Sequence, residues 1–300
     1  MRPVVPSQGG LSSGRKQPAV PEVRSPTLRR RELGAFLRAR RQELGLTVDQ
    51  VAERLLCSPS KVSRMETGQR GATARDVRDL CELYGVLDAG ERERLMNLAR
   101  EGKEQGWWQS YDLDFSTYVG LEAAATELKY YQTTIVPGLL QTADYARAMI
   151  EVSVPALSPE RIEKLLEVKL TRQQILTQDP PLKVWALLDE AALHRVVGGP
   201  SVMARQLDKL TELTSTPYVT MQVIAFGAGA HAAMDSTFNI LDFAGPVPSV
   251  VYVEGLVGWI YLDRPQDIDR YQQVFALLRE KALSPQESRE LIAKIAEKYR

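Results

Sequence analysis

The sequence predicts an all-α N-terminal domain, followed by an α+β or α/β C-terminal domain with a sheet of about five strands. Helix-capping residues recur at short intervals over the first hundred residues, whereas all the segments predicted to form strands lie after residue 180. The chain has 300 residues, of which 44% are hydrophobic and 25% charged, so it is long enough for about two domains with buried cores.

The N-terminal third divides into an arm and a helical domain. Residues 1–25 are rich in Pro, Gly and Ser and show no apolar period, which predicts a disordered, mildly basic arm. In the helical domain, residues 26–104, the first helix is expected to run from Pro26 to Leu44 and to end at Gly45, a C-cap residue. Four further helices are expected to follow the capping residues Thr47, Ser58, Thr73 and Asp88.

The predicted C-terminal domain, residues 105–300, mixes helices and strands. Helices are expected near residues 117–131, 144–152, 159–176, 189–197, 201–214, 266–281 and 285–298. Strands are expected at 182–188, 218–224, 237–243, 249–254 and 258–262.

Charge and cysteine usage narrow the class of protein. Residues 1–104 carry 20 Lys and Arg against 14 Asp and Glu, while the rest of the chain carries 18 against 24. This excess of positive charge suits a polyanionic partner, although it is modest. The chain has two cysteines, Cys57 and Cys81, which are too few for a disulfide framework. We find neither an apolar run long enough to cross a membrane nor the apolar core of a signal peptide. We therefore expect a cytoplasmic protein without membrane attachment.

Two short predicted helices, at 47–56 and 58–67, have the spacing of a helix-turn-helix unit. Such a unit needs a small residue inside its first helix and apolar residues on the inner face of its second, and Ala52, Val62 and Met65 meet these needs. Ser60 and Arg64 lie one turn apart on a different face. Because adjacent short helices are common in all-α domains, this pattern alone leaves open whether the second helix contacts DNA or only contributes to the core.

More specific residues resolve this alternative in favour of DNA. Residues 44–70 (LGLTVDQVAERLLCSPSKVSRMETGQR) resemble the Cro/C1-type, phage-repressor-like helix-turn-helix family, and the likeness extends over roughly residues 28–101. The resemblance implies that Pro59, Ser60 and Arg64 contact base edges, and that Lys61 and Ser63 contact phosphates or bases. It also implies a structural ion pair between Arg41 and Glu66.

Three positions depart from this family pattern. Val48 replaces a frequent Gln, so a DNA contact is expected to be missing, and Pro59 has no main-chain N–H to donate. Leu56 stands where the turn usually has Gly. We therefore expect either a left-handed residue strained by about 1 kcal/mol or a different turn.

The C-terminal domain also resembles a known family. Four segments, spread over most of residues 107–282, are similar to the large domain of WhiJ-like actinomycete regulators; they are 136–149, 189–199, 227–243 and 251–263. The resemblance implies a transcriptional regulator, often associated with a small partner protein, and names no ligand.

Catalysis is not expected. His194 and His231 are the only histidines, and the chain has no metal-ligand spacing, nucleophile elbow or phosphate-binding loop, so we expect neither an enzyme nor a cofactor or metal. His231, in a loop expected to be flexible, is the candidate for contact with an effector or partner. An aromatic set could form an apolar pocket, but core packing is favoured; its members are Trp107, Trp108, Tyr130, Tyr131 and Trp185.

The sequence therefore predicts a sequence-specific transcriptional regulator that binds double-stranded DNA as a homodimer. We expect its C-terminal domain to dimerise and to sense a ligand or a small protein partner. The alternative is an antitoxin-like or adaptor protein that mainly binds a small protein partner and regulates its own synthesis through DNA binding.

Overall fold

The computed structural model describes residues 25–300, except for 112, 114, 154–155 and 246. The arm predicted for residues 1–25 lies outside the described residues, apart from Ser25. Within the described part of the chain, none of the helices has both the length and the apolar character that a membrane crossing needs.

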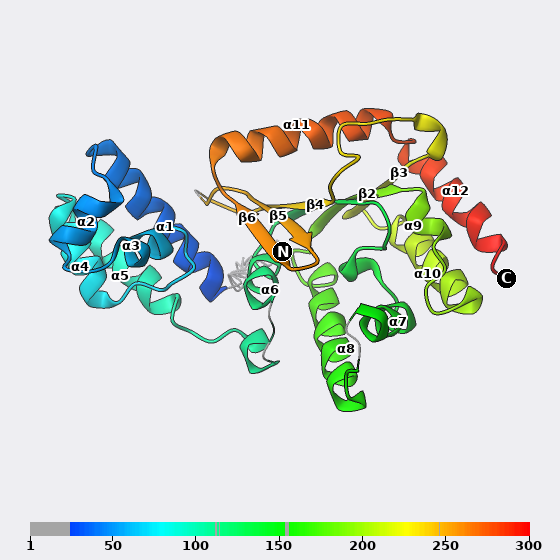
Figure 1. The fold of residues 1–300 in the computed structure, drawn as a ribbon, viewed down its shortest axis with the longest axis horizontal. Coiled ribbons are helices and arrows are strands. Elements are labelled where there is room, and N and C mark those ends of the chain that lie inside the picture. Colours follow the sequence, from blue (N-terminus) through cyan, green and yellow to red (C-terminus); the bar gives the residue numbers. More distant parts are fainter. Residues whose placement is uncertain (1–24, 112, 114, 154–155, 246) are drawn as a thin grey trace, which may run out of the picture.

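The N-terminal part consists of five helices packed around one core (Figure 1). They are α1 (Pro26–Glu43), α2 (Val48–Arg54), α3 (Pro59–Glu66), α4 (Ala74–Leu83) and α5 (Ala89–Glu101). Each begins directly after a residue whose side chain accepts a main-chain hydrogen bond; these caps are Ser25, Thr47, Ser58, Thr73 and Asp88. The all-α N-terminal domain predicted from the sequence is confirmed.

The C-terminal part is built on a mixed sheet of six strands in the order β3-β2-β1-β4-β5-β6. Strands β1, β2 and β3 are parallel, while β4, β5 and β6 continue the sheet in antiparallel fashion. The strand bounds are β1 (Glu127–Gln132), β2 (Lys183–Asp189), β3 (Val219–Ile224), β4 (Phe238–Asp242), β5 (Val250–Gly255) and β6 (Gly258–Leu262).

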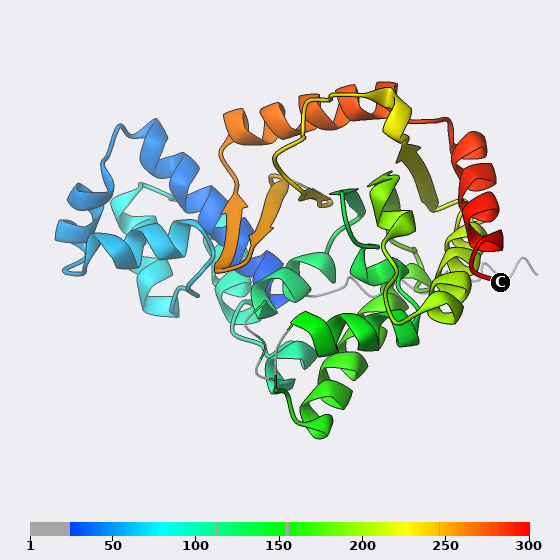
Figure 2. The same ribbon diagram turned by 45° about the vertical axis from the view of Figure 1, so that its right-hand side comes forward.

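Helices cover both faces of this sheet, as Figures 1 and 2 show. Helix α11 (Pro265–Lys281) packs on one face, where Phe275 and Leu278 meet strand residues such as Phe238. The opposite face packs against α6 (Ser116–Glu122), α7 (Ala143–Ser153), α10 (Pro200–Leu213) and α12 (Pro285–Glu297). Helix α8 (Pro159–Gln173) packs beside α7, and the short α9 (Ala191–His194) follows β2. This arrangement confirms the predicted α+β class.

The helix predicted over residues 117–131 was wrong in its second half. Helix α6 ends at Glu122, and β1 forms instead the centre of the sheet, paired with β2 on one side and β4 on the other. The alanines at 123–125 favour a helix locally, but strand pairing on both sides of residues 127–132 outweighs that preference. The sheet therefore has one strand more than the five predicted.

The two edges of the sheet differ. On the β3 edge, Val223 N–H donates to Ser288 Oγ at 2.9 Å and Leu283 N–H donates to Val223 O at 2.9 Å, so the start of α12 covers that edge. Edge strand β6 and the turn before it instead expose the apolar residues Leu256, Val257, Trp259 and Ile260. Natural sheets seldom leave an apolar edge uncovered, because it invites pairing with another chain.

Candidate nucleic-acid interface

The turn between α2 and α3 contains a residue in the left-handed conformation. Leu56 has φ of 51°, and its side chain is 94% exposed. Of the two alternatives that the sequence left open, the structure has the strained residue rather than a different turn. Ser58 then caps α3 by accepting from Lys61 N–H at 3.2 Å, and Pro59 occupies the first helical position, where a missing N–H costs nothing.

Helix α3 has one buried face and one exposed face. Val62 and Met65 are 1% and 2% exposed and belong to the core of the five-helix domain. Pro59, Ser60, Ser63 and Arg64 are all exposed. Five residues were predicted to contact DNA. The structure brings four of them together on the solvent side of α3, while the fifth, Lys61, is partly buried.

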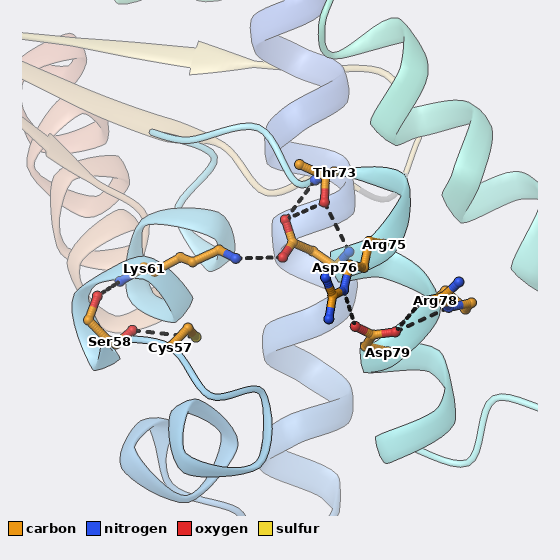
Figure 3. Close-up of polar contacts among 8 residues, drawn as sticks. All are labelled: Cys57, Ser58, Lys61, Thr73, Arg75, Asp76, Arg78 and Asp79. Atoms are coloured by element: carbon orange, nitrogen blue, oxygen red, sulfur yellow. Dashed lines mark hydrogen bonds and ion pairs between the residues drawn. The ribbon is translucent and has the colours of Figure 1, made fainter.

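Lys61 has a partner within the protein (Figure 3). Its Nζ donates to Asp76 Oδ1 at 2.6 Å, and Asp76 also accepts from the main-chain N–H of Thr73 at 2.9 Å, at the start of α4. Burial would raise the pKa of Asp76, but the hydrogen bonds from Lys61 and Thr73 outweigh it and hold this pKa below its usual value. A DNA phosphate would have to compete with Asp76 for Lys61.

Arg41 and Glu66 join α1 to the last turn of α3. Arg41 donates from Nε to Glu66 Oε1 at 2.6 Å and from Nη2 to Oε2 at 2.9 Å, and its Nη1 also donates to Leu46 O at 2.9 Å. Hydrogen bonding to Glu66 raises the pKa of Arg41 above its usual value. This bidentate pair is the structural ion pair that the family resemblance implied.

Gly34 lets α1 approach α3 closely. A Cβ atom at Gly34 would lie 2.5 Å from Met65 O and 2.6 Å from Glu66 O, closer than real Cβ contacts allow. Because both neighbours are main-chain atoms, only a shift of the helices would relieve the overlap. The position of α3 therefore depends on a glycine in α1.

Helix α1 also contacts the C-terminal part of the chain. Ser25 Oγ donates to Gly120 O in α6 at 2.6 Å, and Arg31 Nη2 donates to Asp263 Oδ2, just after β6, at 2.9 Å. Two cavities, of about 520 and 270 Å³, lie at this junction. The larger is lined by Trp107 and Trp108 as well as by residues of α6 and α8.

Comparisons with known proteins identify both parts. Residues 115–294, more than half of the chain, match the family described as a domain of unknown function (DUF5753). The chain belongs to this family. Residues 32–95 match the description helix-turn-helix domain, which indicates a DNA-binding regulator. The comparison with curated proteins found no match, and neither did the comparison with solved structures.

In the DUF5753 domain, His231 lies against Tyr131 rather than in either junction cavity. Its Nε2 is 3.3 Å from Tyr131 Oη, and its Nδ1 accepts from Ala233 N–H at 3.3 Å. Lys281 Nζ holds the same loop by donating to Ala230 O at 2.8 Å. The loop expected to be flexible is thus tied to α11, and contact of His231 with an effector stays a prediction.

The aromatic residues considered for one pocket are distributed over several places in the DUF5753 domain and its junction. Trp107 and Trp108 line the larger junction cavity, and Tyr130 lines a separate cavity inside the domain. The ring of Trp185 is covered by the Arg279 guanidinium, 3.7 Å from its centroid. These residues therefore do not form one common pocket.

Two exposed cations near α3 were not predicted from the sequence. Figure 3 shows Arg75 and Arg78 on α4, directed toward Asp79. Their ion pairs with Asp79 measure 3.5 and 3.0 Å, and both arginines remain largely exposed. The sequence could have indicated this pair, because residues three apart lie on one side of a helix.

The left-handed turn residue gives a testable prediction. Replacing Leu56 with Gly should raise the free energy of unfolding by about 0.5 to 1 kcal/mol, because relief of strain exceeds the added entropy of a glycine in the unfolded chain. Leu56→Ala is the control, since it removes the exposed side chain but keeps the strained backbone. Urea unfolding in which the two variants are equally stable would show that the turn stores no strain.

Proposed function

We propose that this protein is a cytoplasmic, sequence-specific transcriptional regulator that binds double-stranded DNA as a homodimer. In this proposal α3 enters the major groove, and the DUF5753 domain dimerises and senses a ligand or a small protein partner. The likeness to Cro/C1-type and WhiJ-like regulators supports it.

The exposed face of α3 is the observation that carries the proposal. Among the residues that the structure describes, the side chains of Ser60, Ser63 and Arg64 have no hydrogen bond or ion pair. Arg41 and Lys61, by contrast, are engaged within the domain. The planar guanidinium of Arg64, in the last turn of α3, is free to donate twice and suits guanine O6 and N7. Ser60 lies among the N-terminal residues through which the recognition helix of such motifs contacts bases.

The open β6 edge supports dimerisation with a second copy. Two β6 strands pairing antiparallel would be related by a twofold axis and would cover their apolar residues reciprocally. A twofold dimer also matches the paired half-sites to which helix-turn-helix proteins commonly bind. The opposite edge is closed by α12, so we assign the dimer contact to β6.

We further propose that the protein is not an enzyme. His194 lies 3.2 Å from Glu190 Oε1 and stacks on Phe226, and His231 packs on Tyr131. These contacts support packing roles for both histidines.

Substitutions on α3 test the DNA-binding proposal. Arg64→Ala should weaken binding to an operator selected in vitro by about 1 to 3 kcal/mol, with a much smaller loss on random duplex. Lys61→Ala should weaken both duplexes similarly and lower the slope of log K against log salt by at most about 0.9, because a phosphate contact is independent of sequence and Lys61 must leave Asp76 to make it. Titrations at several salt concentrations measure both effects.

The control is Arg205→Ala, which removes an exposed arginine of α10 far from α3 in the sequence and in Figure 1. It should leave both affinities unchanged. Equal losses on operator and random DNA for Arg64→Ala would contradict sequence reading by this residue.

A charge on the sheet edge tests the dimer. Ile260→Lys should convert the dimer to a monomer in sedimentation analysis, because a lysine on an edge strand opposes pairing with a second strand. Val152→Lys, at another exposed apolar residue, is the control and should remain dimeric. A dimer that survives Ile260→Lys unchanged would place the interface elsewhere.

A further inference from the structure

A separate cavity lies inside the DUF5753 domain, away from α3. Its volume is about 340 Å³, within the range of roughly 300 to 1,000 Å³ usual for small-molecule sites. Strands β1, β4 and β5 form one wall, and α6, α7 and α8 form the others. Figure 1 shows these three helices together on one side of the sheet.

Two buried polar atoms on the lining lack a well-aligned hydrogen bond. Tyr130 and Gln141 are each only 2% exposed; among the described residues Gln141 Oε1 has no hydrogen-bond donor, and Tyr130 Oη has Tyr118 and Glu122 near it but no hydrogen bond of ordinary geometry. The amide of Gln141 is oriented by donation from Nε2 to Val136 O at 2.7 Å, so its free oxygen requires a donor. Unsatisfied buried groups are costly and uncommon, and two on one cavity point to an absent binding partner.

The same cavity contains a cation without an ion pair. Lys169 is partly buried and makes no hydrogen bond or salt bridge with the residues that are described. Neighbouring Arg172 is neutralised by Glu122, to which it donates at 2.6 and 2.8 Å. Burial lowers the pKa of Lys169 to about 8, and the neighbouring Arg172 cation contributes to this shift. The carboxylates of Glu254 and Glu122 act in the opposite direction and raise this pKa. An anionic group beside Lys169 would stabilise its charged form.

Aromatic and apolar side chains form much of the rest of the lining, to which Gln132, Ser153, Asn239 and Glu254 add polar groups. The rings of Tyr118 and Tyr252 lie 4.4 Å apart between centroids, and Phe115, Met149 and Leu165 also line the cavity. Such walls suit a flat, apolar ligand body.

We propose that this cavity binds a small aromatic carboxylate that also carries an N–H or O–H donor. Its ring packs among Tyr118, Tyr252 and Phe115, its carboxylate meets Lys169, and its polar groups satisfy Tyr130 and Gln141. The inference rests on the proposed function, because it specifies the ligand class for the domain proposed to sense a signal.

Helix α6 provides a physical connection from this cavity to the DNA-binding domain. Tyr118 on α6 lines the cavity and accepts from Asn239 Nδ2 at 3.2 Å. Two residues further on, Gly120 O accepts from Ser25 Oγ, the cap of α1. A ligand that shifts α6 would therefore act on the helix against which α3 packs.

Calorimetry on the full chain with indole-3-acetate tests the ligand class, with indole-3-acetamide as the uncharged control of nearly the same shape. The carboxylate should bind with a millimolar or lower Kd, and the amide about tenfold more weakly, since a charge-assisted hydrogen bond is lost. Lys169→Met should abolish this preference, whereas Lys164→Met, at an exposed lysine of α8, should keep it. Absence of binding at millimolar concentration, or equal binding of both probes, overturns the proposal.

The hydroxyl of Tyr130 gives a second readout. Tyr130→Phe should raise the melting temperature of the free chain, because a buried hydroxyl without a well-aligned hydrogen bond is removed, and should weaken the probe. Tyr145→Phe, the control, should lower the melting temperature, because Tyr145 Oη accepts from Val136 N–H at 3.3 Å. A Tyr130→Phe chain that melts lower and binds the probe normally would overturn the assignment.

The two proposals can fail separately. A chain that binds the carboxylate through Lys169 but binds no DNA keeps the cavity site and loses the proposed regulator. A chain that binds its operator but neither probe keeps DNA binding and loses the ligand class.

Discussion

The close packing of α1 against the end of α3 fixes the direction in which α3 presents its exposed side chains. Gly34 allows two helix backbones to touch, and the bidentate Arg41–Glu66 pair holds them in register. Glu66 is only 7% exposed, and removing one partner of such a pair typically costs about 3 to 5 kcal/mol. Because Val62 and Met65 are buried on the same side of α3, the outward direction of Ser60, Ser63 and Arg64 follows from this contact.

The same helix joins the DNA-binding domain to the DUF5753 domain. Ser25 and Arg31 bind Gly120 and Asp263 from the first two turns of α1, whereas Gly34 and Arg41 serve α3 further along. Burial lowers the pKa of Arg31, and the charge of Asp263 acts against this shift. Helix α1 thus contacts the DUF5753 domain near its start and α3 further along, so a shift at one of these contacts can be passed to the other through a single helix.

Features set by neighbouring residues could be predicted from the sequence, whereas features set by distant residues could not. Thr47, Ser58 and Thr73 marked their helices because a cap and its N–H partner lie three residues apart. Strand β1 was missed because its partners, β2 and β4, are far along the chain. The Lys61–Asp76 pair and the cavity lined by Tyr130 and Gln141 likewise depend on how separate elements meet. The ion pair between Arg41 and Glu66 was predicted from the family resemblance, because the spacing of these two residues in the sequence would not have indicated it.

Hydroxyl-radical footprinting of the full chain tests most directly whether α3 and the preceding turn form the DNA-contacting surface. Leu56 and Pro59 are exposed beside the proposed contact, while Val152 is exposed at the end of α7 and serves as the internal reference. Addition of the selected operator duplex should strongly reduce oxidation of Leu56 and Pro59 and leave Val152 unchanged. Unchanged oxidation of Leu56 and Pro59 in a chain saturated with operator would contradict the account, because DNA would then be bound by a surface other than α3.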